Sequence, residues 1–106
     1  MWYISGQEIK MAEGDWGLTL PIVISGTTLT ALDEIKLVIK TAMNGDTILE
    51  KTYTNITQNT VNFSLTESES ELLPVGIYVY RLDWYQGGAF MCNIIPFSNY
   101  KVVDKA

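Results

Sequence analysis

The chain has 106 residues, of which 47% are hydrophobic and 18% charged, and its net charge is −5. This length and apolar content predict a single folded domain over residues 1–106 and exclude an intrinsically disordered chain. The seven basic residues are scattered, and no two of them adjoin, which argues against nucleic acid or an anionic membrane surface as a partner.

Residue types that carry common chemistry are scarce. The sequence has no histidine, which removes the usual general base and the commonest metal ligand. Its one cysteine, Cys92, cannot form an intrachain disulfide, and in the apolar context "AFMCNII" it is expected to behave as a small hydrophobe. No apolar run reaches the roughly 20 residues of a membrane span, and the N-terminus does not resemble a secretory signal. We therefore expect a soluble and complete chain.

The first half of the chain shows apolar residues with a period of 2, which predicts strands. A first strand is expected near residues 8–11. The next, at 16–24, contains Pro21, which marks an edge position or a bulge because proline cannot donate a ladder hydrogen bond. The segment "SGTT" at 25–28 closes it. Its inward face is expected to carry alternate apolar residues: Trp16, Leu18, Leu20, Ile22 and Ile24.

The middle of the chain continues this pattern. "MNGD" at 43–46 contains Asn-Gly, a strong signal for a two-residue hairpin because both residues tolerate positive φ. This hairpin joins a strand at 35–40 to a weaker one at 47–53, and a further strand follows at 61–65. The residues expected to face inward are Ile35, Leu37, Ile39, Val61, Phe63 and Leu65, whereas Lys36, Val38 and Lys40 alternate with the first three.

A short helical turn is expected at 67–72. Thr66 and Glu69 have the spacing of a capping box, in which each side chain bonds the backbone of the other residue. Pro74 then prevents the helix from continuing.

The strand from Ile77 to Tyr85 is the most aromatic part of the chain, and a second hairpin through Gly87-Gly88 follows it. The charged residues on one face assign that face to the exterior, so the other face is expected to fill the core. The expected interior set is Tyr78, Tyr80, Leu82 and Trp84, and the exterior set is Ile77, Val79, Arg81, Asp83 and Tyr85. With a last strand at 99–104, this spacing predicts seven or eight antiparallel strands in a β-sandwich or barrel.

The segment "GIYVY", which follows the helical turn, resembles the start of strand F in immunoglobulin-like domains. In that family a tyrosine bonds to upstream backbone and a cysteine two residues later bridges the sheets. Tyr78 stands at the tyrosine position, and Tyr80 stands where the cysteine would be. The resemblance implies an immunoglobulin-like β-sandwich without a disulfide.

A wider resemblance covers residues 14–104. The order of "EGDWGLTLPIVISG", "LDEIKLVIK", "ILEK", "VNFSLTESESELLPVGIYVYRLDWYQGG" and "FSNYKVVD" is similar to the immunoglobulin-like N-terminal domain of phage baseplate upper proteins and to related short tail-associated prophage proteins. This implies a non-enzymatic structural module made in the bacterial cytoplasm and carried in the virion if phage-encoded. Those baseplate proteins are longer, whereas this chain ends two residues after Asp104, so we expect a free-standing decoration or tail accessory.

The outward face of the Ile77–Tyr85 strand is a candidate interaction surface. If strand 35–40 is its neighbour, Val38 and two flanking lysines extend an apolar patch rimmed by charge, and such patches mark protein–protein contacts. We expect self-association or docking to virion proteins here, although isolated exposed valine and isoleucine are also ordinary surface. The candidate residues are Lys36, Val38, Lys40, Ile77, Val79, Arg81, Asp83 and Tyr85.

No catalytic, cofactor-binding or metal-binding residue is predicted. The acidic turn "TESESE" lacks the spacing of a calcium loop, no sequence pattern selects a pair of glycosidase carboxylates, and "QGG" lacks the lysine and helix of a phosphate loop. An enzyme is therefore not expected.

A glycan-binding or cell-surface adhesion module is the alternative function. Aromatic residues at the loop ends of a β-sandwich can stack on sugar rings, although they can equally belong to the core. The residues that support this alternative are Trp2, Tyr3, Tyr85, Phe90, Phe97 and Tyr100.

Overall fold

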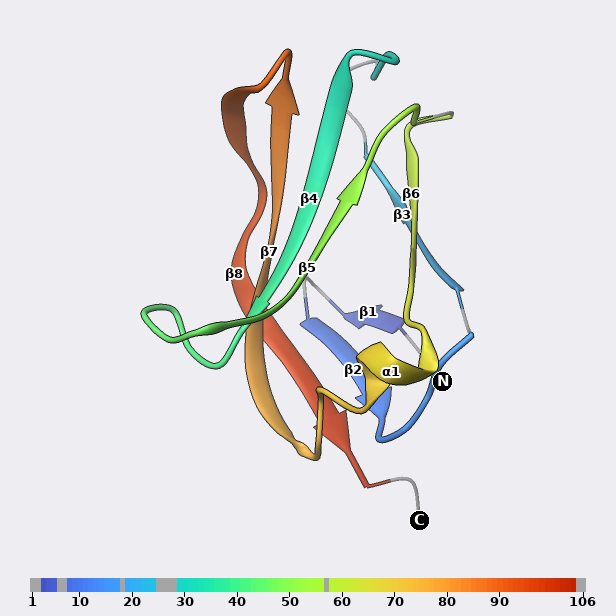
Figure 1. The fold of residues 1–106 in the computed structure, drawn as a ribbon, viewed down its shortest axis with the longest axis vertical. Coiled ribbons are helices and arrows are strands. Elements are labelled where there is room, and N and C mark those ends of the chain that lie inside the picture. Colours follow the sequence, from blue (N-terminus) through green and yellow to red (C-terminus); the bar gives the residue numbers. More distant parts are fainter. Residues whose placement is uncertain (1–2, 6–7, 18, 25–28, 57, 105–106) are drawn as a thin grey trace.

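The structure is a computed structural model that describes residues 3–5, 8–17, 19–24, 29–56 and 58–104 (Figure 1). Its described part contains eight strands and one short helix, which confirms the prediction of an all-β fold. In chain order these elements are β1 (Tyr3–Ser5), β2 (Glu8–Ala12), β3 (Thr19–Val23), β4 (Asp33–Lys40), β5 (Thr47–Tyr53), β6 (Thr60–Ser64), α1 (Glu67–Ser70), β7 (Gly76–Gln86) and β8 (Ala89–Val103).

The strands form two sheets. One has six strands in the order β1-β2-β8-β7-β4-β5, and the other pairs β3 with β6. All pairings are antiparallel except that of β2 with β8, which is parallel, so the prediction of purely antiparallel strands is wrong there. Strands joined by a short hairpin must be antiparallel. Strands β2 and β8 are separated by most of the domain, so the connection between them allows either direction.

Strand β3 begins later than the sequence predicts. Gly14 and Gly17 adopt positive φ angles of 80° and 77°, so the chain turns before the strand starts at Thr19. Trp16 consequently lies outside β3 and is 53% exposed, which corrects its predicted interior position. Leu20, Ile22 and Ile24 are buried as predicted, whereas Leu18 and the turn at 25–28 lie outside the described residues.

The two predicted hairpins differ in outcome. Gly87 and Gly88 both have positive φ and join β7 to β8 through a two-residue turn, as predicted. The β4–β5 hairpin forms, but its connection spans six residues, and the described residues with positive φ do not include Asn44 or Gly45. The predicted tight Asn-Gly turn is therefore wrong. Glycine is needed there for space, because a Cβ on Gly45 would meet Thr41 Oγ1 and would lie 2.9 Å from the backbone nitrogen of Ala42.

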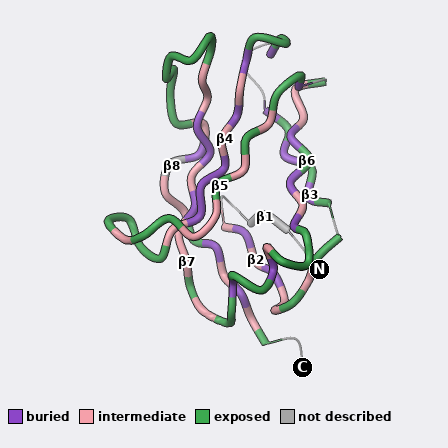
Figure 2. The backbone as a smooth tube through the Cα atoms, viewed as in Figure 1, coloured by how far each residue is buried: buried purple, intermediate pink, exposed green. Residues whose placement is uncertain are grey.

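The core lies between the two sheets, where Figure 2 shows the buried segments. Tyr80 and Leu82 are fully buried, as predicted, and Tyr78 and Trp84 pack against the core while half-buried. Tyr100 packs edge-on against both Tyr80 of its own sheet and Phe63 of the other, with ring centroids 6.2 Å apart in each pair. Burial raises the pKa of the Tyr80 phenol to about 12.

Side-chain hydrogen bonds fix both ends of β7. The Tyr78 hydroxyl donates to the Pro74 carbonyl at 2.7 Å, which confirms the bond to upstream backbone that the resemblance implied. Near the other end, Trp84 Nε1 donates to Asp33 Oδ1 at 2.9 Å. The Thr30 amide donates to the same buried carboxylate, and these hydrogen bonds, above all the one from Thr30, lower the pKa of Asp33.

The predicted capping box is present at α1, where Thr66 and Glu69 bond each other's backbone. Glu69 also forms a 2.9 Å ion pair with Lys51 of β5, and the Lys51 ammonium donates to the Ser64 carbonyl as well. Burial by itself raises the pKa of Glu69, but the hydrogen bonds from Thr66 and Lys51 outweigh it and leave the pKa lowered. This cluster ties the helix to the edge of the six-stranded sheet.

We expect Glu69→Gln to lower the free energy of unfolding by about 1 kcal/mol at neutral pH, because it removes a charge-assisted pair and weakens a cap. A lowered folded-state pKa means that the unfolded chain binds the proton more readily. The contribution is therefore present above the unfolded-state value of about 4.3 and is lost as the pH falls through the folded-state pKa. Urea unfolding at neutral and acidic pH measures both effects.

Glu67→Gln is the matched control, because Glu67 lies on the same helix but is exposed. We expect only a small change from it. Equal losses from the two variants would show that helix charge, rather than the Glu69 contacts, stabilises this end of the domain.

Candidate functional site

The candidate site lies on the face of the six-stranded sheet that points away from β3 and β6. Cross-strand pairs share a face, so the register places outward residues of β4 beside outward residues of β7: Glu34 pairs with Tyr85, Lys36 with Asp83 and Val38 with Arg81. Phe90 and Asn93 of β8 pair with Tyr85 and Asp83 on the other side.

Strand β8 reaches this face through three irregularities in its pairing with β7. The register shifts between Tyr80 and Leu82, between Leu82 and Asp83, and between Trp84 and Tyr85. At each shift β8 contributes one more residue than β7, and such bulges redirect side chains. Phe90 and Asn93 are three residues apart and would lie on opposite faces of a regular strand, but here both pair with outward residues.

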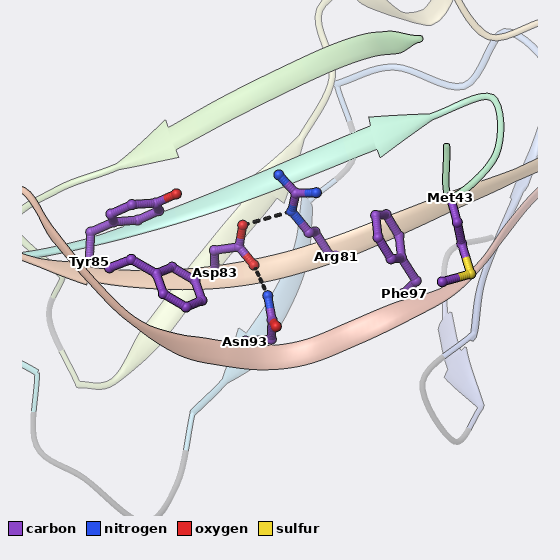
Figure 3. Close-up of a pocket in the computed structure, with 7 residues that line it drawn as sticks. Met43, Arg81, Asp83, Tyr85, Asn93 and Phe97 are labelled. Atoms are coloured by element: carbon purple, nitrogen blue, oxygen red, sulfur yellow. Dashed lines mark hydrogen bonds and ion pairs between the residues drawn. The ribbon is translucent and has the colours of Figure 1, made fainter. Parts of the chain in front are cut away.

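These side chains surround an open pocket of about 460 Å³. Figure 3 shows polar groups at its centre, the Tyr85 ring at one end, and Met43 and Phe97 at the other. The Phe90 ring lies against Tyr85. Its lining residues are Met43, Arg81, Asp83, Tyr85, Phe90, Asn93 and Phe97. We call this pocket the outer groove.

A buried carboxylate organises the centre of the outer groove. Asp83 is only 2% exposed. Arg81 Nε donates to its Oδ2 at 2.7 Å, and Asn93 Nδ2 donates to its Oδ1. The terminal guanidinium nitrogens of Arg81 point away from the carboxylate (Figure 3). Asp83 therefore fixes the orientation of two planar polar side chains that are themselves partly open to solvent.

The aromatic residues of the outer groove differ in how open they are. Tyr85 and Phe90 form an edge-on pair with centroids 5.5 Å apart, and Lys36 Nζ lies 4.6 Å from the Tyr85 ring centroid. Lys40 and Arg81 both approach the Phe97 ring, at 5.6 and 5.3 Å from its centroid. Cations thus occupy positions over Tyr85 and Phe97, whereas Phe90 is 53% exposed.

Only some residues of the predicted interaction surface lie in the outer groove. Arg81, Asp83 and Tyr85 line the outer groove, whereas Ile77 is 66% exposed and lies near the opposite end of β7. The lysines of the prediction contact the groove's rings, and Val79 is half-buried.

Two residues of that prediction are buried rather than exposed, namely Val38 (3% exposed) and Asp83 (2%). Both point outward, but long side chains fold over this face. Arg81, the cross-strand neighbour of Val38, and Lys40 extend over Phe97, and Arg81 and Asn93 engage Asp83. Alternation in the sequence identified the face correctly but could not show the side chains that cover it.

The aromatic residues proposed for glycan binding do not all lie at one site. Tyr85, Phe90 and Phe97 converge in the outer groove, but Tyr100 is fully buried in the core, so its suggested role is wrong. Trp2 and the side chain of Tyr3 lie outside the described part of the chain. Sequence reasoning missed Met43 and Asn93, because no local pattern shows that the β4–β5 connection and a bulged strand meet at one pocket.

Residues with possible chemical roles elsewhere are dispersed. Within the described residues, no group of three or more acidic, cysteine or histidine side chains could hold a metal ion, and no helix is long and apolar enough to cross a membrane. Cys92 is exposed, which corrects the expectation that it packs as a small hydrophobe. It lies near the β7–β8 hairpin, and the described core residues of β8 start only at Ile94 and Ile95.

In comparisons with known proteins, no family model, curated protein or solved structure matches the chain. Function is therefore inferred from the groove and from the residues that form it.

Proposed function

We propose that this chain is a non-enzymatic recognition module of immunoglobulin-like type, carried as a tail, baseplate or decoration component of a phage or prophage particle. The outer groove is its recognition site. The observation that carries the recognition part is the joint presence of an exposed ring, Phe90, and of polar side chains that a buried carboxylate, Asp83, holds in place. The particle part is supported by the resemblance of residues 14–104 to phage baseplate upper proteins.

The strand order supports the immunoglobulin-like part of the proposal. Strands β8, β7, β4 and β5 are neighbours in one sheet and face β3 and β6 in the other, as in the sandwich of that family. A helical turn precedes β7, and Tyr78 of β7 bonds back to Pro74.

The groove itself supports the recognition part. Its volume of about 460 Å³ falls within the roughly 300–1,000 Å³ of small-molecule sites. Preorganised polar groups lower the entropic cost of binding, because they lose little freedom when a partner arrives.

A protein partner, whether a virion protein or a second copy of the chain, is the second candidate for what the module binds. Arginine, methionine and aromatic residues are enriched at protein interfaces, and Met43, Arg81 and Phe97 line the groove. The apolar patch predicted around it is, however, divided, because Val38 is buried and Ile77 is exposed near the opposite end of β7.

The proposal is tested in the particle itself. We expect mass spectrometry to find the chain in purified particles. We also expect Arg81→Glu, introduced into the gene, to reduce host adsorption or particle assembly by about tenfold, as the loss of roughly 1.4 kcal/mol of binding would. Ile77→Ser, on the same strand but outside the groove lining, is the control and should leave both unchanged.

Absence of the chain from purified particles would contradict the virion assignment. Unchanged adsorption and assembly in the Arg81→Glu particles would show that the outer groove is not a recognition site.

A further inference from the structure

We propose that the outer groove binds a neutral saccharide, with one sugar ring resting on Phe90 and hydrogen-bonded by Arg81 and Asn93. This inference rests on the proposed function only in that it takes the outer groove as the recognition site. The polar groups, the open ring and the charge around the groove indicate the chemistry of the ligand.

The polar groups of the groove suit a ligand that carries hydroxyl groups. Each hydroxyl both donates and accepts hydrogen bonds. Arg81 uses Nε for Asp83, which leaves its terminal N–H groups to donate, and Asn93 uses Nδ2 for Asp83, which leaves its Oδ1 to accept. Arg81 and Asn93 therefore offer a free donor and a free acceptor beside one carboxylate, and sugar hydroxyls can bond to both kinds of group.

Phe90 is the ring on which a sugar can rest. It is 53% exposed, and Tyr85 holds it through an edge-on contact. The face of an aromatic ring is electron-rich and attracts the weakly positive C–H groups of a flat ligand. Tyr85 and Phe97 already have cations over their rings, so they support the groove rather than provide its open platform.

The charge around the groove favours a neutral ligand. The outward residues of β4, β5 and β7 near the groove include three basic side chains, Lys36, Lys40 and Arg81. They also include three acidic ones, Glu34, Glu50 and Asp83. Two ion pairs join members of the two sets, Arg81 with Asp83 and Lys36 with Glu50. Balanced charge gives no net field to concentrate an anionic ligand.

The size of the groove favours a sugar over a protein. A stable protein interface buries about 800 Å² on each partner, whereas the groove is a local hollow, and the nearest predicted apolar extension, Val38, is buried. A sugar ring needs only the hollow itself.

The test is a titration of the full ¹⁵N-labelled chain, followed by NMR chemical shifts. The probes are oligosaccharides of glucose, galactose, mannose, xylose and N-acetylglucosamine, with an oligosaccharide of glucuronic acid as the anionic comparison. We expect at least one neutral probe at millimolar concentration to shift the amide signals of Tyr85, Phe90 and Asn93, and the anionic probe to bind no more tightly.

Variants then locate the binding. Phe90→Ala should weaken it by about tenfold, which corresponds to roughly 1.4 kcal/mol, and Phe90→Tyr, which keeps the ring, should retain it. Ile77→Ala removes an exposed apolar side chain of β7 outside the groove lining and should have no effect. Because Phe90 is already half exposed, its substitution should leave the spectrum of the folded chain otherwise unchanged.

The saccharide inference is overturned if no neutral probe shifts the groove signals, if Phe90→Ala binds as tightly as the unmodified chain, or if the anionic probe binds more tightly. It is also overturned if a purified virion protein, and no saccharide, shifts the same signals. In that last case Arg81→Glu would still impair the particle, so recognition by the groove would stand while its ligand class changed.

Discussion

Replacing Tyr100 with alanine is expected to lower the free energy of unfolding by about 3–5 kcal/mol, the range for removing a large buried ring. Tyr100 is fully buried and contacts Tyr80 of its own sheet and Phe63 of the two-stranded sheet. Its loss would leave a cavity where the two sheets meet. Domains of this size are stable by only about 5–15 kcal/mol, so this loss removes a large part of the total stability.

Tyr100→Phe separates ring packing from hydrogen bonding. It keeps the ring and removes only the hydroxyl, which donates to the Met11 sulfur at 3.2 Å. Thioether sulfur is a weak acceptor, so we expect a loss of no more than about 1 kcal/mol. Urea unfolding followed by near-ultraviolet circular dichroism measures both variants. Similar losses from the two would show that the hydroxyl, not the ring, stabilises the sheet contact.

The second large effect is expected from Asp83→Asn, which changes stability and binding together. Arg81 Nε and Asn93 Nδ2 donate to different oxygens of the carboxylate, and an amide carries an acceptor at only one of these two positions. The buried NH₂ group of the new amide then faces one of the two donors and has no acceptor, at a cost of about 1–3 kcal/mol. The two side chains also lose their fixed orientation, and we expect ligand binding in the outer groove to weaken by at least about tenfold.

Glu50→Gln is the control for this variant. Glu50 points outward on β5 and forms a 3.9 Å ion pair with Lys36, and its side chain is 49% exposed. Exposed pairs contribute about 0–1 kcal/mol, so stability and binding should change little. If Asp83→Asn binds ligand as well as the unmodified chain does, the buried carboxylate does not organise the groove.

Part of the candidate site could be predicted from the sequence. Alternation along residues 77–85 placed Arg81, Asp83 and Tyr85 on one outward face, and the structure places all three in the outer groove. The contribution of β8 could not be predicted, because its bulges break the period of 2 on which such reasoning depends. Met43 comes from a connection whose conformation differs from the predicted turn.

The sequence by itself determined the features that depend on neighbouring residues. Alternating apolar positions, two glycines at the β7–β8 turn and the capping box around Thr66 each act within a few residues, so their outcome follows from local geometry. The same local reasoning assigned Tyr80 and Leu82 to the core.

Only the tertiary structure decided which distant segments meet. The parallel pairing of β2 with β8, the burial of Val38 and Asp83, and the meeting of Phe90 and Phe97 with Arg81 depend on contacts between residues far apart in the chain or in neighbouring strands. Such contacts depend on how whole faces of the sheets pack. The sequence of a single strand does not show which side chains from other segments will cover it. The outer groove is therefore a property of the folded domain.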